Sequence, residues 1–180
     1  MLFVRRNLFI AIILTAFSLS AHAGRQAVAV DYLHGSDNID GVRLAYRPLS
    51  YDLYTDWFGD IKLYWEASFN IWEYGEENSH ATNLAVAISP VIVKQLTTVY
   101  DKYPLYLEAG IGASLVNDRH FAGKNIGSHY QFEDRLGFLL SLDEQENNQI
   151  ALRYMHYSNG GLNSDNPGLD FLNVSYSYHF

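Results

Sequence analysis

The sequence predicts an all-β fold, an eight-stranded antiparallel transmembrane β-barrel, and three observations lead to it. Apolar and polar residues alternate in segment after segment, which is the period of a β-strand whose two faces differ. Aromatic residues make up 15% of the chain, and tyrosine and tryptophan concentrate where proteins cross a membrane interface. After residue 23, no run is long and apolar enough for a spanning helix, so a membrane protein of this composition spans the bilayer with strands.

The first 23 residues are predicted to be a cleaved signal peptide. Arg5 and Arg6 form a basic start, a mostly apolar segment follows over residues 8–19, and Ala21-His22-Ala23 has the small-x-small pattern of a cleavage site. The alternative, a transmembrane anchor, is disfavoured because the apolar core is short. Cleavage leaves residues 24–180 as one barrel domain and removes two arginines, which changes the formal net charge from −8 to −10.

Alternation marks the strands in order. The clearest segment covers residues 61–72, and the other predicted strands lie at 27–32, 42–47, 83–92, 103–115, 130–140, 150–158 and 170–180. Turn-rich segments at 34–40, 73–80, 117–127 and 159–168 alternate with connections at 49–60, 94–102 and 141–149. The connection 49–60 is long for a periplasmic turn, so we expect it to carry structure of its own. Asp134 falls on the apolar face of its strand, where a β-bulge is one explanation.

The charges on the other face indicate which way the barrel is turned. They are balanced in sign and interleaved with small residues: Asp31, Arg43, Arg47, Lys62, Glu66, Glu108, Glu133, Arg135 and Arg153. Such a face suits a narrow lumen filled by an ion network, with the apolar face turned to lipid. A soluble, lipocalin-like barrel would have the opposite orientation.

Composition also excludes several classes of function. The chain has no cysteine, which excludes a disulfide framework and argues against a thiolate metal site. It is acidic and lacks a basic stripe, so nucleic acid is not an expected partner. His34, His80, His120 and His129 lie in or beside predicted loops without ligand spacing, so no metal site is predicted.

The last two predicted strands carry the candidate chemistry. His156 and Ser158 follow apolar residues of the same parity and therefore share one face of a strand. Asp170 begins the next strand, so an antiparallel hairpin would gather the imidazole, the hydroxyl and the carboxylate at its loop end. A base that reaches the hydroxyl and an acid that orients the base are the parts of a nucleophilic triad. Tyr154 and Tyr157 are interpreted as interface aromatics.

These residues also carry a resemblance to a known family. The run Arg153-x-x-His156-x-Ser158-Asn159-x-Gly161, followed by Asn166-Pro167-Gly168 and an aromatic strand, resembles the PagL family of lipid A deacylases. Members are outer-membrane β-barrel enzymes that remove the acyl chain ester-linked at position 3 of lipid A. The resemblance implies that His156 is the general base and acid and that Ser158 is the nucleophile. The family's acid is a glutamate, whose place Asp170 takes here, and Asp165 in the loop is the alternative acid.

We expect the tetrahedral oxyanion to be held near the hairpin loop. Gly160 and Gly161 can present backbone N–H groups, and the side chains of Asn159 and Asn166 add further donors. No metal or organic cofactor is implied.

The expected partners are lipid A or lipopolysaccharide of the outer leaflet, the membrane, and the outer-membrane assembly machinery, which would recognise Phe180. A homodimer is left open. The alternative to an esterase is a non-enzymatic outer-membrane barrel with a structural or adhesive role.

Overall fold

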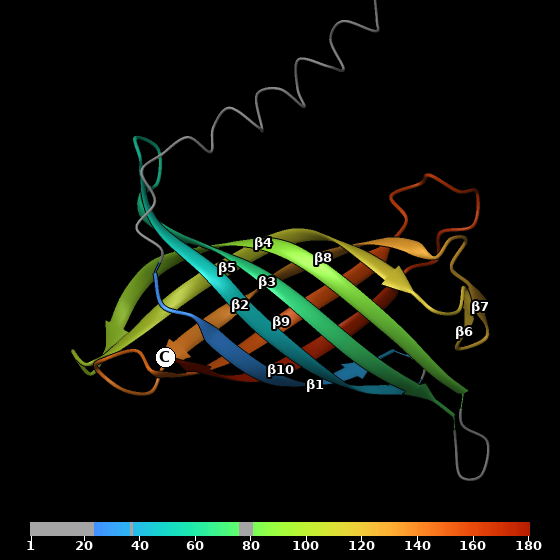
Figure 1. Ribbon diagram of the computed structural model, residues 1–180, viewed down its shortest axis with the longest axis horizontal. Coiled ribbons are helices and arrows are strands. Elements are labelled where there is room, and N and C mark those ends of the chain that lie inside the picture. The colour runs from blue at the N-terminus through green and yellow to red at the C-terminus, as the bar shows by residue number, and fades with distance from the viewer. Residues whose placement is uncertain (1–23, 37, 76–80) are drawn as a thin grey trace, which may run out of the picture.

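The computed structural model describes residues 24–36, 38–75 and 81–180 of the protein. Eight long strands form a closed barrel in which every neighbouring pair is antiparallel (Figure 1). Their bounds are β1 (Ala27–Gly35), β2 (Ile39–Thr55), β3 (Gly59–Tyr74), β4 (Ala81–Val99), β5 (Tyr103–Val116), β8 (Tyr130–Ser141), β9 (Asn148–Ser158) and β10 (Leu169–His179). The short strands β6 (His120–Phe121) and β7 (Lys124–Asn125) pair with each other inside one loop. The predicted eight-stranded barrel is confirmed. The predicted signal peptide and His80 lie outside the described residues.

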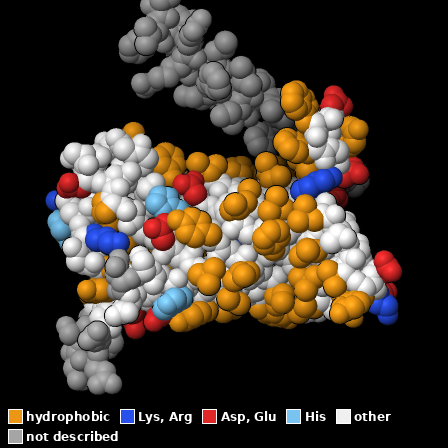
Figure 2. Space-filling model, turned by 180° about the vertical axis from the view of Figure 1, so that it is seen from behind, with side chains coloured by type: hydrophobic (Ala, Val, Ile, Leu, Met, Phe, Trp, Pro, Cys, Tyr) orange, Lys and Arg blue, Asp and Glu red, His pale blue; other side chains and the backbone are white. Residues whose placement is uncertain are grey.

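The apolar face of the sheet points outward. In β1 and β10, buried and exposed residues alternate without a break, and the exposed positions are valine, leucine and tyrosine except at the ends. Figure 2 shows hydrophobic side chains gathered over the middle of the barrel. In the part of the chain that the structure describes, no helix is long and apolar enough to cross a bilayer. A continuous apolar exterior is the arrangement of a membrane barrel and contradicts the soluble, lipocalin-like alternative.

The lumen holds an ion network at mid-height. Glu66 receives hydrogen bonds from Arg43 at 2.5 Å, Arg47 at 2.8 Å and Arg135 at 2.5 Å, and all four side chains are buried. Arg153 pairs in the same way with Glu108. Eight of the nine charges predicted for the lumen are buried there: Asp31, Arg43, Arg47, Glu66, Glu108, Glu133, Arg135 and Arg153. The ninth, Lys62, is half exposed and bonds to Glu146 in the β8–β9 turn.

The lumen is not polar along its whole length. Towards the loops opposite the chain termini, an aromatic cluster of Trp72, Phe121, Tyr157 and Phe171 fills the interior. The interpretation of Tyr157 as an interface aromatic is therefore wrong. Tyr157 has the parity of Arg153, so it points inward, and its hydroxyl donates to Glu133 at 2.8 Å. The interior of an eight-stranded barrel is just wide enough to be filled by side chains. Beyond the ion network, aromatic rings fill it.

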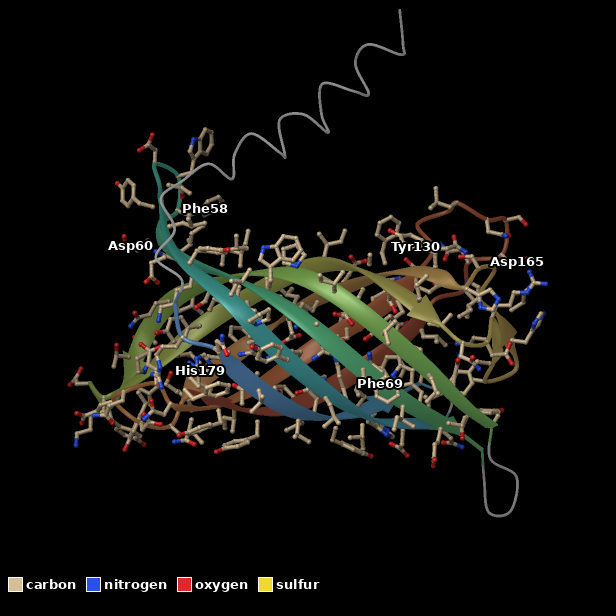
Figure 3. The ribbon with its side chains drawn as sticks, in the orientation of Figure 1. Phe58, Asp60, Phe69, Tyr130, Asp165 and His179 are labelled. Atoms are coloured by element: carbon tan, nitrogen blue, oxygen red, sulfur yellow. The ribbon has the colours of Figure 1, made fainter. Side chains whose placement is uncertain are left out.

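The segment 49–60 lies at the end of the barrel that also holds the chain termini. The segment 49–60 does carry structure: β2 runs on to Thr55 and pairs with β3 from Gly59, after a register shift between Tyr46 and Leu49. Figure 3 shows Phe58 and Asp60 at that end, with His179, while Asp165 lies at the opposite end. Since an exported barrel has its termini on the periplasmic side, the loop that holds Asp165 faces the cell exterior.

Candidate active site

The β9–β10 hairpin brings the candidate residues to the outer surface of the barrel. His156 and Asp170 are direct cross-strand partners, and Ser158 is the last residue of β9. Ile150, Leu152 and Tyr154 on the same face of β9 are exposed, whereas the alternate residues are buried in the lumen. Because side chains alternate strictly between the faces of a strand, His156 and Ser158 belong to the lipid-facing side. All three residues lie at the extracellular end of that side.

His156 and Asp170 form a close pair. The imidazole Nδ1 lies 2.6 Å from Asp170 Oδ1, and because an ionised carboxylate can only accept, Nδ1 is the donor. The neutral imidazole then presents Nε2 as an acceptor, which is the tautomer that a general base needs. The Tyr154 hydroxyl donates to the same carboxylate oxygen. Sequence reasoning had assigned Tyr154 to the interface aromatics, although its shared parity with His156 was a signal for this contact.

Ser158 lies beside this pair but is not joined to it. Its side chain is 9% exposed, its cross-strand partner on β8 is Phe132, and among the described residues no hydrogen bond connects it to His156. Side chains two residues apart on one strand face stand about 6.5–7 Å apart at their Cα atoms. A hydrogen bond therefore requires both side chains to lean together, and such bonds often tighten only when substrate is bound.

The loop after β9 is organised by Asn159. This side chain is fully buried, and its Nδ2 donates to the carbonyl oxygens of Ile126 at 3.1 Å and Asp165 at 2.7 Å. Its Oδ1 accepts from the Gly161 N–H at 3.0 Å. Of the four donors expected for an oxyanion, two are thus occupied by the loop itself.

The other two expected donors have no acceptor among the described residues. They are the Gly160 N–H and the Asn166 Nδ2 group. Gly160 has a φ of +64°, a conformation that favours glycine. The Asn166 Oδ1 accepts from the Asn159 N–H at 2.9 Å, which holds the amide in place.

The structure separates the two candidate acids. Asp165 Oδ2 accepts from Asn125 Nδ2 at 2.5 Å, which ties the β9–β10 loop to the hairpin of β6 and β7. Asp170 is the carboxylate that contacts the imidazole. Gly168, with a φ of +69°, packs against the ring beside the two nitrogens, where an added Cβ would lie 2.6 Å from His156 Cε1.

A second carboxylate flanks the histidine. Asp134 on β8 is the other cross-strand partner of His156, and the register of β8 shows no shift at this point. The suggested bulge is therefore wrong. Asp134 points outward because it has the parity of the exposed residues of β8, and it lies partly buried beside the imidazole. A carboxylate on the apolar face of this strand was the signal in the sequence for this contact. In the described part of the chain, no cluster of three or more His, Cys, Asp or Glu residues is placed to hold a metal ion.

Comparison with known proteins identifies the family. The sequence model described as lipid A 3-O-deacylase (PagL) matches residues 40–179. The chain belongs to the PagL family. The lipid A deacylase PagL of Pseudomonas aeruginosa is 31% identical over 169 residues, which cover 91% of this chain and 93% of that protein. The PagL of Bordetella bronchiseptica is 49% identical over 77 residues, which span 42% of this chain and 41% of that relative.

Solved structures agree with the PagL assignment. A crystal structure of the outer-membrane enzyme PagL superposes with a TM-score of 0.69 at 26% identity and covers 84% of this chain and 98% of its own. A de novo designed transmembrane β-barrel matches with a TM-score of 0.51 at 13% identity, covers 90% of this chain and 100% of its own, and shares the fold alone. This PagL-family protein is an outer-membrane β-barrel.

Proposed function

We propose that this PagL-family protein hydrolyses the ester that links an acyl chain to position 3 of lipid A, with Ser158 as nucleophile. His156 is the general base and then the general acid, and Asp170 orients the imidazole. The observation that carries the proposal is the His156–Asp170 pair on the lipid-facing surface. Polar groups on such a surface are costly and are found where function requires them.

The reaction follows from the available atoms. His156 Nε2 takes the Ser158 proton as Oγ attacks the ester carbonyl carbon, and the Asp170 carboxylate stabilises the imidazolium that forms. The Gly160 N–H and Asn166 Nδ2 donate to the tetrahedral oxyanion. The intermediate collapses, His156 returns the proton to the sugar oxygen, and the sugar leaves as an alcohol. Water, deprotonated by His156, then attacks the acyl-serine. The Oγ–acyl bond breaks, the fatty acid is released, and His156 returns the proton to Ser158 Oγ.

The location suits a lipid substrate. The outward-facing residues below His156 and Asp170 are apolar, among them Leu152 and Val174, which are exposed cross-strand partners. Acyl chains of a lipid in the outer leaflet would lie against them, so the ester could reach Ser158 by lateral diffusion. Water for the second half-reaction would enter from the interface.

The test is a pair of substitutions in the purified barrel. Ser158→Ala and His156→Ala should each abolish release of the acyl chain from lipid A in detergent micelles, measured by mass spectrometry. Both variants should keep the heat-modifiable migration of a folded barrel. Ser164→Ala is the matched control, because Ser164 is an exposed serine of the same loop whose hydroxyl, among the described residues, bonds only to Asn163. Full deacylation by folded Ser158→Ala would instead favour the structural or adhesive alternative.

The route to the membrane is also a proposal. Export would remove residues 1–23, and the alternating aromatics at the end of β10 would present the assembly signal. Tyr178 and Phe180 are exposed and their rings stack at 6.5 Å between centroids. N-terminal sequencing should begin at Gly24, and Phe180→Ala should lower the yield of assembled barrel. A homodimer remains a prediction, which the mass of the protein in detergent checks.

A further inference from the structure

The sequence carries the pattern of the active-site strand a second time. Tyr154-Met155-His156-Tyr157-Ser158 ends β9, and Tyr32-Leu33-His34-Gly35 ends β1 and is followed by Ser36. Both are Tyr-x-His-x-Ser, and in both the tyrosine and the histidine face outward, since Leu33 and Met155 are buried. Each strand is the first of a hairpin whose turn faces the cell exterior. The pattern on β9 holds two members of the proposed triad, and the pattern on β1 has no role in that triad.

The second pattern also repeats the geometry. Asp40 is the direct cross-strand partner of His34, as Asp170 is of His156. His34 Nδ1 lies 2.8 Å from Asp40 Oδ1, and the Tyr32 hydroxyl donates to the same oxygen at 2.6 Å. We call Tyr32, His34 and Asp40 the β1–β2 cluster. Figure 2 shows histidine side chains beside acidic ones at the edge of the hydrophobic band.

The differences between the two clusters decide what the second one can do. The β1–β2 turn has only residues 36–38 between its strands, whereas residues 159–168 separate β9 from β10. The turn is thus shorter by seven residues than the loop that presents Gly160 and Asn166. The β1–β2 cluster is also more open: its His and Asp side chains are 62% and 54% exposed, against 32% and 44% for His156 and Asp170. Such an open cluster suits binding of a polar group, whereas an oxyanion is stabilised by preorganised donors such as those of the β9–β10 loop.

The two clusters lie on neighbouring hairpins of one surface. β10 separates β9 from β1, and the Ser36 N–H donates to the Asp170 carbonyl oxygen at 3.3 Å. Leu172 is the cross-strand partner of both Tyr154 and His34. Two strand spacings and a two-residue offset put the Cα atoms of His34 and His156 roughly 12 Å apart. A lipid with a disaccharide headgroup and several acyl chains is broad enough to cover both.

The acceptor atoms of the cluster that have no donor among the described residues indicate the kind of ligand. Because Nδ1 of His34 donates to the carboxylate, Nε2 of the neutral ring is an acceptor, and Asp40 Oδ2 is an acceptor without a donor among the described residues. Two unpaired acceptors suit hydroxyl groups, which donate. A phosphate is mostly deprotonated at neutral pH and would be repelled by Asp40. The cluster therefore fits a sugar ring better than an anion.

We propose that the β1–β2 cluster binds the hydroxyl groups of the sugar headgroup of the lipid whose ester is cleaved at Ser158. The inference rests on the proposed function and deepens it, because it assigns a residue set to recognition of the headgroup. Binding there would hold the substrate across β10 with its ester at β9. Hydrogen bonds to Asp40 and His34 would then lower KM for the lipid without contributing to the chemical step.

The test compares a lipid with a substrate that lacks the headgroup. Tyr32→Phe and Asp40→Ala should raise KM for purified lipid A in detergent micelles, about tenfold for Asp40→Ala, and leave kcat within twofold. Hydrolysis of p-nitrophenyl octanoate, which needs only the triad, should be unchanged. Tyr46→Phe is the matched control, because Tyr46 is an exposed tyrosine of β2 that donates to Gln26 at 2.9 Å at the periplasmic end.

Three results would overturn the inference. They are an unchanged KM for lipid A in Asp40→Ala, an equal loss on lipid A and on the p-nitrophenyl ester, and fluorophosphonate labelling of Ser36 in a Ser158→Ala protein. The last would make the cluster a second nucleophilic site. Failure of the proposed triad is distinguishable, because it would appear as residual deacylation by Ser158→Ala irrespective of Asp40.

Discussion

The resemblance to the PagL family puts Asp170 in the place of a glutamate, and the hairpin explains why the shorter side chain reaches the imidazole. Asp170 and His156 face each other across one antiparallel pair, where the Cβ atoms of direct partners are about 4.5–5.5 Å apart. A carboxylate one methylene shorter still contacts Nδ1 at that separation. Tyr154 adds a second donor to the same oxygen, which restrains the carboxylate on its exposed side.

At this position, Asp170→Asn should lower kcat for lipid A by up to about 10⁴-fold, as loss of the orienting acid does in other triads. An amide can present its NH₂ to the ring and favour the wrong tautomer. Asp170→Glu should keep measurable activity, and Asp165→Asn should stay within twofold of the parent, because Asp165 bonds to Asn125 and not to the imidazole. Steady-state kinetics with lipid A check all three. Loss of activity in Asp165→Asn alone would assign the acid to the loop.

At the scale of elements, the loop between β9 and β10 is a rigid part of the site. Asn159 ties it to the segment before β8 and to its own far end, and Asp165 ties it to β7. Gly168 closes the loop against the imidazole with a positive φ. The loop thus fixes both the proposed oxyanion donors and one edge of His156.

Gly168→Ala should therefore inactivate the enzyme without unfolding the barrel. The new Cβ would lie 2.6 Å from His156 Cε1, so the ring must leave the position in which Asp170 holds it. Gly161→Ala is the matched control: its φ of +76° imposes a similar backbone strain, but nothing lies within 4 Å of the added atom. We expect deacylation to fall at least tenfold more in Gly168→Ala than in Gly161→Ala, measured on protein with equal heat-modifiable migration. Equal losses in both would mean that strain, and not contact with His156, is responsible.

At the scale of the whole molecule, an apolar exterior surrounds a charged lumen. Glu66 lies at the centre of that lumen and contacts three buried arginines. Removing one member of such a network leaves charges buried without compensation, which costs more than the pair itself contributes.

Glu66→Gln should destabilise the barrel by about 3–5 kcal/mol, because Arg43, Arg47 and Arg135 lose their shared carboxylate. Lys62→Gln serves as the comparison, since Lys62 is 46% exposed at the lumen mouth, and it should change stability by less than about 1 kcal/mol. Unfolding in urea, followed by tryptophan fluorescence in detergent micelles, gives both values. A stable Glu66→Gln barrel would contradict a structural role for the network.

Strand parity in the sequence determined the fold class, the charged interior and the outward face of His156, Ser158 and Asp170. It did so because a two-residue period depends only on local geometry. Parity also places Tyr157 inward with Arg153, and its assignment to the interface overlooked this. Parity cannot report depth along the lumen, so the aromatic cluster could not be predicted from it.

Nor can parity report the register between strands far apart in the chain. The place of Asp134 beside His156, the bonds of Asn159 to Ile126, and the position of the β1–β2 cluster next to β10 all depend on that register. The sequence shows Tyr-x-His-x-Ser twice, but only closure of the barrel brings the two copies onto one surface. Closure pairs β1 with β10, the two ends of the chain, and no local pattern encodes that contact.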